Sequence, residues 1–320
     1  MPVLLLAIEP ARLPEGVEAR VRADAPEYEV LVTRDRDEVR RRAGDIEIII
    51  GFPPRELLPA MPKLAWVQQW MAGADWLRHH PELADAGFTL TSAVGIHAVQ
   101  IGEHVFAGLL ALARELPSAV LAQRERRWHG FNDVAPFELF DKNLLVVGVG
   151  AIGARVAELG KAFGMHVTGL RRHPGKGEAG VERMVGPDGL DDELADADAV
   201  VLTVPLTEET RGLLDARRIG AMKHGAVLVN VGRGGTVDEA ALAGALADGH
   251  LRGAALDVFE AEPLPPSSPL WGVPNLLVTA HYAGATPRYA ERAMALALEN
   301  LARYRAGQPL KNVVDMQLGY

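Results

Sequence analysis

A glycine-rich turn near the middle of the chain constrains the fold more than any other feature. The segment LLVVGVGAIG covers residues 144–153 of 320, and its apolar beginning is typical of a buried parallel strand. Gly148, Gly150 and Gly153 then fit the G-x-G-x-x-G pattern of a dinucleotide-binding turn. The first glycine permits a tight turn, the second lets the backbone approach a pyrophosphate, and the third lets a helix pack closely on the strand.

The residues after this turn support the same interpretation. The sequence ARVAELGKAFG predicts an amphipathic helix. Its N-terminal N–H groups, with Ala151 and Ile152 beside the turn, are suited to bind phosphates. A plain glycine turn is the alternative, but the strand before it and the helix after it favour nucleotide binding. Because the turn comes only at mid-chain, we expect another domain to precede it.

Length and composition limit the classes of protein to consider. The chain has 320 residues, enough for two domains, and is 48% hydrophobic and 23% charged, as in ordinary globular proteins. A net charge of −9 disfavours nucleic acid and anionic membranes as partners. The absence of cysteine excludes disulfides, thiolate metal sites and a cysteine nucleophile. We find no signal peptide and no apolar membrane segment, and therefore expect a soluble cytoplasmic protein.

Short apolar runs alternate with helical patterns through the first hundred residues. This alternation predicts a parallel sheet that is covered by helices on both faces. The strands expected here are VLLLAIE, YEVLVT, IEIIIG, KLAWVQQW and FTLTSA, and the helices are VEARVRAD and DRDEVRRRA.

The rest of the chain predicts a second domain of the same class. A long apolar helical stretch runs from His97 to about Arg127 and is broken at Pro117. The expected strands after the glycine turn lie in HVTGLRR, LADADAVVLTVPLT, GAVLVNVGRGG, GAALDVF and LLVTAHYAG, with helices in TRGLLDARRIGAM and VDEAALAGALADG. The last helix, PRYAERAMALALENLARYRAG, is expected to return to the first domain.

The predicted fold is therefore α/β, with two doubly wound parallel-sheet domains. A Rossmann cofactor domain of residues 97–284 is inserted into a flavodoxin-like substrate domain of residues 1–96 and 285–320.

Three ionisable residues follow three successive strands of the second domain. Arg233 follows AVLVNV, Glu262 follows ALDVFE, and His281 follows LLVTA. Ligands of open α/β sheets bind beyond the carboxyl ends of the strands. Singly, these residues have ordinary explanations as a turn cation, a solvated loop carboxylate and a hydrogen-bonded histidine. Together at one sheet edge, they favour an active site.

At these residues the chain resembles the D-isomer-specific 2-hydroxyacid dehydrogenase family, and the glyoxylate/hydroxypyruvate reductases in particular. The resemblance covers essentially the whole chain, and its motifs occur in the family's order and spacing. The matching segments are GVGAIG, VPLTEETRGLL, NVGRGGTVDEAAL, ALDVFEAEPLPPSSPLW and VTAHYAGAT, and more loosely WMAGAD and IHAVQIGEHV. It implies hydride transfer between NAD(P)H and a small 2-oxo acid or D-2-hydroxy acid.

The resemblance also assigns roles to the three residues. Arg233 would bind the substrate carboxylate and carbonyl in a bidentate manner, and His281 would donate the proton to the ketone oxygen. Glu262 would pair with His281 and stabilise its imidazolium form. A loop of small residues in the first domain would offer backbone N–H groups to the substrate carboxylate, namely Met71, Ala72, Gly73 and Ala74. The candidates for the side-chain pocket are Trp70, Met71, His97 and Tyr282.

Further residues are expected to bind the cofactor. Asp257 would accept a hydrogen bond from the nicotinamide carboxamide, with a capping role after a strand as the alternative. The strand-end residues Val204, Pro205, Val231 and Gly232 complete this set.

The strand HVTGL ends in Arg171 and Arg172, where an NAD-preferring fold usually carries a carboxylate for the ribose 2′-hydroxyl. Two guanidinium groups suit a 2′-phosphate, so we expect NADP, with NAD as the alternative.

Two functions other than catalysis are compatible with a fold of this class. A nucleotide-sensing binding protein, like the corepressors that share this fold, is the alternative to an enzyme, and a passive scaffold is disfavoured by the Arg-Glu-His set.

His97 and His104 are seven residues apart without a third ligand, so no metal site is expected. The resemblance also implies a homodimer through the helices around residues 100–130. Trp128 and Phe131 are candidate interface anchors, because aromatic residues are enriched at interfaces.

Overall fold

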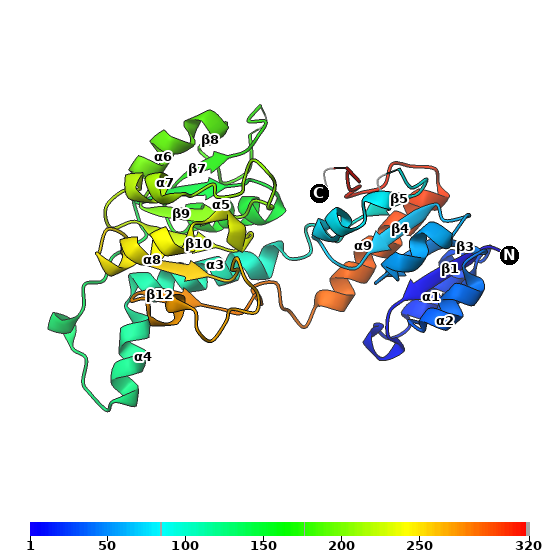
Figure 1. Cartoon of the computed structure of the whole chain (residues 1–320), viewed down its shortest axis with the longest axis horizontal. Helices are drawn as coiled ribbons and strands as arrows, with labels where there is room; N and C mark the ends of the chain where they lie inside the picture. The colour runs from blue at the N-terminus through cyan, green and yellow to red at the C-terminus, as the bar shows by residue number, and fades with distance from the viewer. Residues whose placement is uncertain (84, 176, 318–320) are drawn as a thin grey trace. The chain divides into compact units, whose positions relative to one another are not determined.

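The computed structural model describes residues 1–83, 85–175 and 177–317. The chain divides into two compact units, each with its own sheet (Figure 1). Unit 1 consists of Met1–Ile96 and Thr286–Tyr320, and unit 2 consists of His97–Ala285. Unit 2 is thus inserted into the sequence of unit 1, and both sheets are parallel, which confirms the predicted α/β fold class.

The sheet of unit 1 has five parallel strands in the order β2-β1-β3-β4-β5. This is the flavodoxin-like order. The strands are β1 (Val3–Ala7), β2 (Glu29–Val32), β3 (Ile46–Gly51), β4 (Trp66–Gln69) and β5 (Thr89–Thr91). The runs VLLLA and IIIG are fully buried, because helices or loops cover both faces of the central strands.

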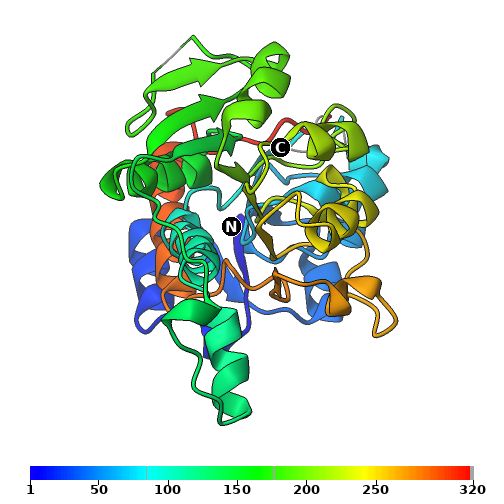
Figure 2. The same ribbon diagram turned by 90° about the vertical axis from the view of Figure 1, so that its left-hand side faces the viewer.

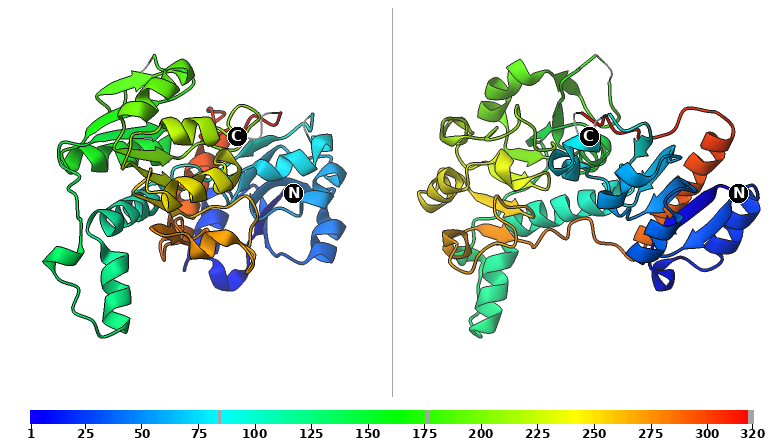
Figure 3. Two further views of the ribbon diagram at one scale, coloured as in Figure 1. Left: turned by 60° about the vertical axis from the view of Figure 1, so that its left-hand side comes forward. Right: turned by 45° about the vertical axis from the view of Figure 1, so that its right-hand side comes forward.

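The helices of unit 1 come from both ends of the chain. They are α1 (Val17–Asp24), α2 (Arg36–Arg42) and α9 (Tyr289–Arg305). Helix α9 lies beside the strands of unit 1, with its buried side chains in the same core cluster as those of β1 and β3 (Figure 3). Tyr304 stacks on Trp66 with ring centroids 5.4 Å apart, and Asn300 Nδ2 donates to Gln68 Oε1 over 2.8 Å. The C-terminal segment is therefore part of the core of unit 1.

The sheet of unit 2 has seven parallel strands in the order β12-β11-β10-β9-β6-β7-β8. Its strands are β6 (Asn143–Val147), β7 (His166–Leu170), β8 (Arg183–Val185), β9 (Ala199–Leu202), β10 (Val227–Asn230), β11 (Gly253–Leu256) and β12 (Leu276–Val278). This is the doubly wound Rossmann order, extended by β12. Strand β8 was not predicted, because it is a three-residue edge strand and is only partly buried.

Helices cover both faces of this sheet. They are α3 (Ala98–Ala113), α4 (Leu116–Arg124), α5 (Ala151–Ala162), α6 (Leu190–Asp196), α7 (Ala216–Ala221) and α8 (Glu239–Ala247). Side chains of α3 and α5 share one core cluster, and those of α6, α7 and α8 share the other. Helix α6 was not predicted, and α7 is shorter than predicted because Asp215 caps it by accepting the Arg218 N–H.

The long helical stretch breaks earlier than predicted. The break lies at Glu115, which has a φ of 58°, whereas Pro117 lies in the first turn of α4, where its missing N–H is not needed. Helix α4 projects from the rest of unit 2 (Figure 2). No single helix in the described chain is long and apolar enough to span a membrane. Only α3 and α4 taken together, across a 68° bend, reach that length and composition.

Candidate active site

The three ionisable residues predicted at strand ends lie at one edge of the unit 2 sheet. Strands β10, β11 and β12 are parallel neighbours, and Arg233, Glu262 and His281 follow them in turn. His281 Nδ1 lies 2.7 Å from Glu262 Oε2, and Glu262 Oε1 accepts the Phe259 N–H over 2.9 Å. The His281 side chain remains 50% exposed, so its ring is both oriented and accessible.

Buried polar side chains shape the loop that carries Arg233. Asn230 Nδ2 and the Thr236 hydroxyl both donate to the Arg233 carbonyl, over 3.1 and 2.6 Å, while Asn230 Oδ1 accepts the Gly232 N–H. Asn230 and Thr236 are 1% and 0% exposed. A Cβ on Gly234 would lie only 1.8 Å from the carbonyl carbon of Phe259, so this loop packs directly against the loop that leads to Glu262.

The backbone of His281 is held in the left-handed region, with a φ of 53°. Such a conformation is costly for a non-glycine residue and persists only where its surroundings enforce it. Here the His281 N–H donates to the Asp257 carbonyl over 2.8 Å. The Asp257 carboxylate accepts the N–H groups of Tyr282 at Oδ1 and Ala283 at Oδ2, and the Thr279 hydroxyl at Oδ1 over 2.5 Å. Asp257 is 3% exposed, so a buried carboxylate holds the loop 279–283 through these hydrogen bonds.

The glycine turn has the shape that a dinucleotide pyrophosphate requires. Gly148 has a φ of 102°, and a Cβ there would lie 2.7 Å from Val204 Cγ1. A Cβ on Gly153 would lie 2.2 Å from the Gly148 carbonyl oxygen, whereas one on Gly150 would meet nothing within 4 Å. No side chain of the described chain caps the N-terminus of α5. The N-terminus of α5 therefore presents uncapped N–H groups next to open space, which is the arrangement that phosphate binding needs.

Arg171 and Arg172 come directly after β7, as predicted, and each lies near a carboxylate. Arg171 Nη1 is 3.9 Å from Glu178 Oε2, and Arg172 Nη2 is 3.6 Å from Glu209 Oε2. The Arg171 N–H also donates to the Val185 carbonyl over 3.2 Å, which fixes the start of this loop against β8. The two cations are thus gathered at the end of β7.

The predicted carboxylate-binding loop lies in unit 1 directly after β4. Gln69 Nε2 donates to the carbonyl oxygens of Met71 and Gly73 over 2.9 and 3.0 Å, and Gln69 Oε1 accepts the Trp76 indole N–H. Both carbonyls are therefore bound by the same buried amide, which fixes the loop conformation. Met71 is 40% exposed, whereas Ala74 is 2% exposed.

The candidates for the side-chain pocket differ in exposure. Tyr282 is 53% exposed, and His97 is half-buried beside Gly284. Trp70 differs from the expectation, because it is 5% exposed and packs in a core cluster of unit 1. Its carbonyl accepts the Tyr289 hydroxyl, and the two rings lie 6.1 Å apart.

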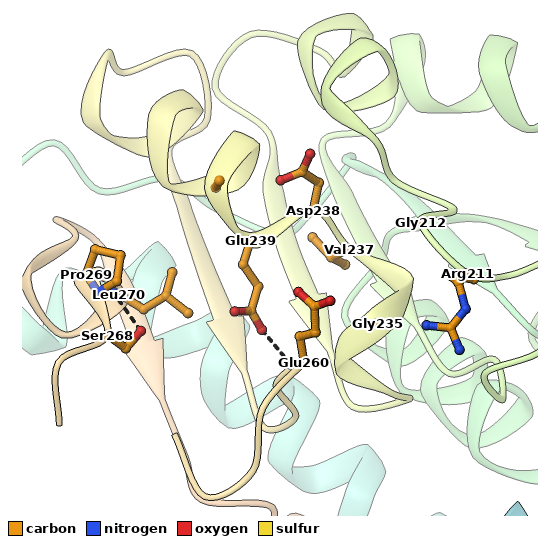
Figure 4. A pocket seen from close by; sticks show the side chains of 11 residues that line it. Arg211, Gly212, Gly235, Val237, Asp238, Glu239, Glu260, Ser268, Pro269 and Leu270 are labelled. Carbon is orange, nitrogen blue, oxygen red and sulfur yellow. Dashed lines mark hydrogen bonds between the residues drawn. The ribbon is translucent and has the colours of Figure 1, made fainter. Parts of the chain in front are cut away.

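A separate pocket of about 540 Å³ lies beside the loop after β10 (Figure 4). Its lining includes Arg211, Asp238, Glu239 and Glu260, but none of the three candidate catalytic residues. Two of the carboxylates have structural partners: Asp238 accepts the Ala241 N–H at the start of α8, and Glu239 accepts the Glu260 N–H. The pocket is therefore distinct from the candidate active site.

Comparison with known proteins assigns the family. The model of the D-isomer specific 2-hydroxyacid dehydrogenase, NAD binding domain, matches residues 106–283. The chain belongs to the D-isomer specific 2-hydroxyacid dehydrogenase family. A glyoxylate reductase of Korarchaeum cryptofilum is 35% identical over 270 residues, which cover 82% of this chain and 80% of that protein.

Two solved structures of family members match nearly the whole dehydrogenase. A D-isomer specific 2-hydroxyacid dehydrogenase from Xanthobacter autotrophicus, in complex with NADPH and MES, is 33% identical, with a TM-score of 0.83. An NADPH-dependent glyoxylate/hydroxypyruvate reductase from Sinorhizobium meliloti, in complex with NADP and sulfate, is 30% identical, also with a TM-score of 0.83. Each match covers 100% of this chain and 99% of the other. The present dehydrogenase is thus an NAD(P)-dependent, glyoxylate reductase-like oxidoreductase.

Four supporting residues of this dehydrogenase escaped the sequence analysis. Asn230, Thr236, Gln69 and Thr279 hold the loops that carry the candidate site residues. The available signal was a polar residue at the end of an apolar strand, as in VLVN and WVQQ. Buried polar residues need hydrogen-bond partners, so such positions indicate a shaped loop.

Proposed function

We propose that this dehydrogenase reduces a small 2-oxo acid with NADPH, and that His281 is the general acid. The observation that carries this proposal is the 2.7 Å contact between His281 Nδ1 and Glu262 Oε2 beside the Arg233 loop. When bound, the nicotinamide supplies a hydride to the carbonyl carbon. His281 gives a proton from Nε2 to the carbonyl oxygen, and the product is the 2-hydroxy acid.

Glu262 holds the imidazole in the form that this step needs. With its carboxylate accepting the Nδ1 proton, the ring presents Nε2 to the substrate. The carboxylate also stabilises the imidazolium before transfer, and the ring returns to its neutral Nδ1–H form afterwards. Arg233 offers a planar pair of N–H donors, which suits the carboxylate and the carbonyl oxygen of a 2-oxo acid. In the reverse direction, His281 accepts the hydroxyl proton as a base.

The two units have different proposed roles. Unit 2 binds the nucleotide, and unit 1 is the substrate domain. The backbone N–H groups of Met71, Ala72, Gly73 and Ala74 bind the substrate carboxylate. The binding of two loop carbonyls by Gln69 supports this role, because it fixes the loop before substrate arrives.

The cofactor contacts follow from the strand ends of unit 2. The pyrophosphate lies on the turn and helix start formed by Gly148, Gly150, Ala151, Ile152 and Gly153. The nicotinamide end is bounded by Val204, Pro205, Val231 and Gly232. Asp257 Oδ2 accepts the Ala283 N–H over 2.9 Å, and we assign the second lone pair of this oxygen to the carboxamide.

Arg171 and Arg172 support NADPH over NADH. Their guanidinium groups follow β7, the strand whose end contacts the adenosine ribose in this fold. A 2′-phosphate would replace the carboxylates of Glu178 and Glu209 as their anionic partner. The NADPH and NADP complexes of the two solved family members agree with this preference.

The test is a measurement of initial rates with NADPH and with NADH against a panel of 2-oxo acids that includes glyoxylate and hydroxypyruvate. We expect NADPH to be preferred and His281→Ala to lower kcat by about 10²–10⁴-fold, the usual range for a general acid. The matched control is His224→Ala, a histidine beside His250 at another place in unit 2.

The outcomes of this test separate three functions. Turnover that favours NADH keeps the enzyme and refutes the cofactor preference. Turnover that survives in His281→Ala refutes the assigned acid. Tight nucleotide binding without turnover of any acid would favour the nucleotide-sensing alternative.

A further inference from the structure

A histidine outside the candidate catalytic set contacts the loop that carries His281. His104 lies on α3, and its Nε2 is 3.1 Å from the Thr279 hydroxyl. The His104 ring also meets the Tyr282 ring edge to face, with centroids 5.7 Å apart. Thr279 and Tyr282 lie two residues before and one residue after His281, so His104 contacts the loop on both sides of it.

The hydrogen atoms of this chain of contacts have one consistent arrangement. The Thr279 hydroxyl has a single proton, and its 2.5 Å contact with Asp257 Oδ1 takes that proton. Asp257 Oδ1 and Oδ2 already accept the N–H groups of Tyr282 and Ala283, so the carboxylate is the acceptor. The Thr279 oxygen must then accept from His104, which places a proton on Nε2 of that ring.

Helix α3 fixes the position of the His104 side chain. Helix α3 packs in the core of unit 2, where the neighbouring Val105 is 0% exposed and Phe106 is 4% exposed. The His104 side chain itself is 24% exposed. A donor fixed on a core helix thus holds Thr279, and Thr279 holds the carboxylate that binds the loop.

We propose that His104 and Thr279 are positioning residues that aim the His281 imidazole, a role that rests on the proposed function. His104 Nε2–H, the Thr279 hydroxyl and the Asp257 carboxylate form one relay. It keeps His281 at its positive φ and keeps its ring against Glu262. Without the relay, the loop 279–283 relaxes and the imidazole leaves the geometry needed for proton transfer, while the glycine turn that binds the nucleotide is untouched.

Two pairs of variants test the relay. Thr279→Val removes the hydroxyl at nearly constant shape, and Thr279→Ser retains it. His104→Leu removes the donor, and His104→Gln retains an N–H close to the position of Nε2. Glu103→Gln, at the exposed neighbouring position, is the matched control. The readouts are kcat per nucleotide-binding site, KM for NADPH, and the melting temperature.

We expect Thr279→Val and His104→Leu each to lower kcat about tenfold, the effect of one lost hydrogen bond. KM for NADPH changes less than kcat, because the glycine turn assigned to the pyrophosphate is untouched. Thr279→Ser and His104→Gln restore kcat, and the Thr279→Val/His104→Leu double variant is no slower than the slower single variant. In the wild type, ¹⁵N NMR of labelled histidine finds the His104 proton on Nε2. This measurement needs no variant to fold.

Other results overturn the inference. Unchanged kcat in Thr279→Val and His104→Leu, or losses that multiply in the double variant, would show that the contacts do not act as one relay. A lower melting temperature with normal kcat per binding site would show a structural role alone. A His104 proton on Nδ1 only would contradict the donor assignment. Absence of wild-type turnover would instead refute the proposed function, and the relay's role in it with that.

Discussion

At the scale of single residues, Asp198 shows how one carboxylate stabilises unit 2. Its side chain is 20% exposed and binds Lys223 Nζ over 2.8 Å and the Asn143 N–H over 3.0 Å. Burial raises the pKa of Asp198, but these hydrogen bonds and the nearby lysines outweigh burial, so its pKa is lowered. A carboxyl whose pKa is lower in the folded state stabilises that state above its unfolded pKa, and the contribution disappears as pH falls through the folded pKa.

Asp198→Asn is therefore expected to destabilise the protein by about 1 kcal/mol at pH 7. The difference should stay constant down to about pH 4, near the unfolded pKa of an aspartate, and narrow only below it. Thermal unfolding of the wild type and Asp198→Asn at a series of pH values measures this. Asp188→Asn, at an exposed position in the same unit, is the control. A difference that widens toward low pH would contradict the assignment.

At the scale of elements, the hairpin of α4 and the following loop presents apolar side chains on a projecting arm. Trp128 and Phe131 are 92% and 90% exposed, and Val120 and Leu121 of α4 are more than half exposed. Soluble proteins rarely leave such a group uncovered. Aromatic residues are enriched at protein interfaces, and a second copy of this chain is the partner that the sequence analysis predicts here.

Substitution of both aromatic residues, Trp128→Ser and Phe131→Ser, is expected to convert a homodimer into a monomer. Size-exclusion chromatography with light scattering measures the mass, and Val94→Ser, an exposed apolar position in unit 1, is the control. A wild type with the mass of one 34.4 kDa chain would refute the dimer itself. A dimeric double variant would move the interface elsewhere.

The same scale shows what the sequence could predict. Long apolar runs such as IEIIIG and NLLVV identified the central strands, because both faces of a parallel sheet are buried. The edge strand β8 and the short helix α6 lacked that signal. Ligands of open α/β sheets bind beyond the carboxyl ends of the strands. This rule predicted that Arg233, Glu262 and His281 share one sheet edge, because it depends on topology alone. The inward-facing carboxylate of Asp257 depends on loop geometry. Its link to His104 depends on a helix about 150 residues earlier in the chain, so no local sequence pattern indicates it.

At the scale of the whole molecule, each unit has its own sheet and its own buried core clusters. The clusters of unit 2 draw only on residues of His97–Ala285, one continuous segment. Those of unit 1 need both chain ends, because Ala297 and Leu301 of α9 pack with Leu4 and Leu6 of β1. The core of unit 2 is therefore complete within one continuous segment, whereas residues 1–96 do not contain the complete core of unit 1.

The isolated segment 97–285 is accordingly expected to fold and to bind NADPH within about tenfold of the affinity of the full chain, yet to reduce no 2-oxo acid. It retains the glycine turn and the Arg233, Glu262 and His281 set, but lacks the loop of residues 71–74 that we assign to the substrate carboxylate. Loss of a substrate-orienting group alone can cost several orders of magnitude in rate. Calorimetric titration with NADPH and an NADPH oxidation assay with glyoxylate measure the two properties. Residues 1–96 alone, as the comparison, should show no cooperative unfolding. Turnover by segment 97–285 near that of the full chain would show that unit 1 has no part in substrate binding.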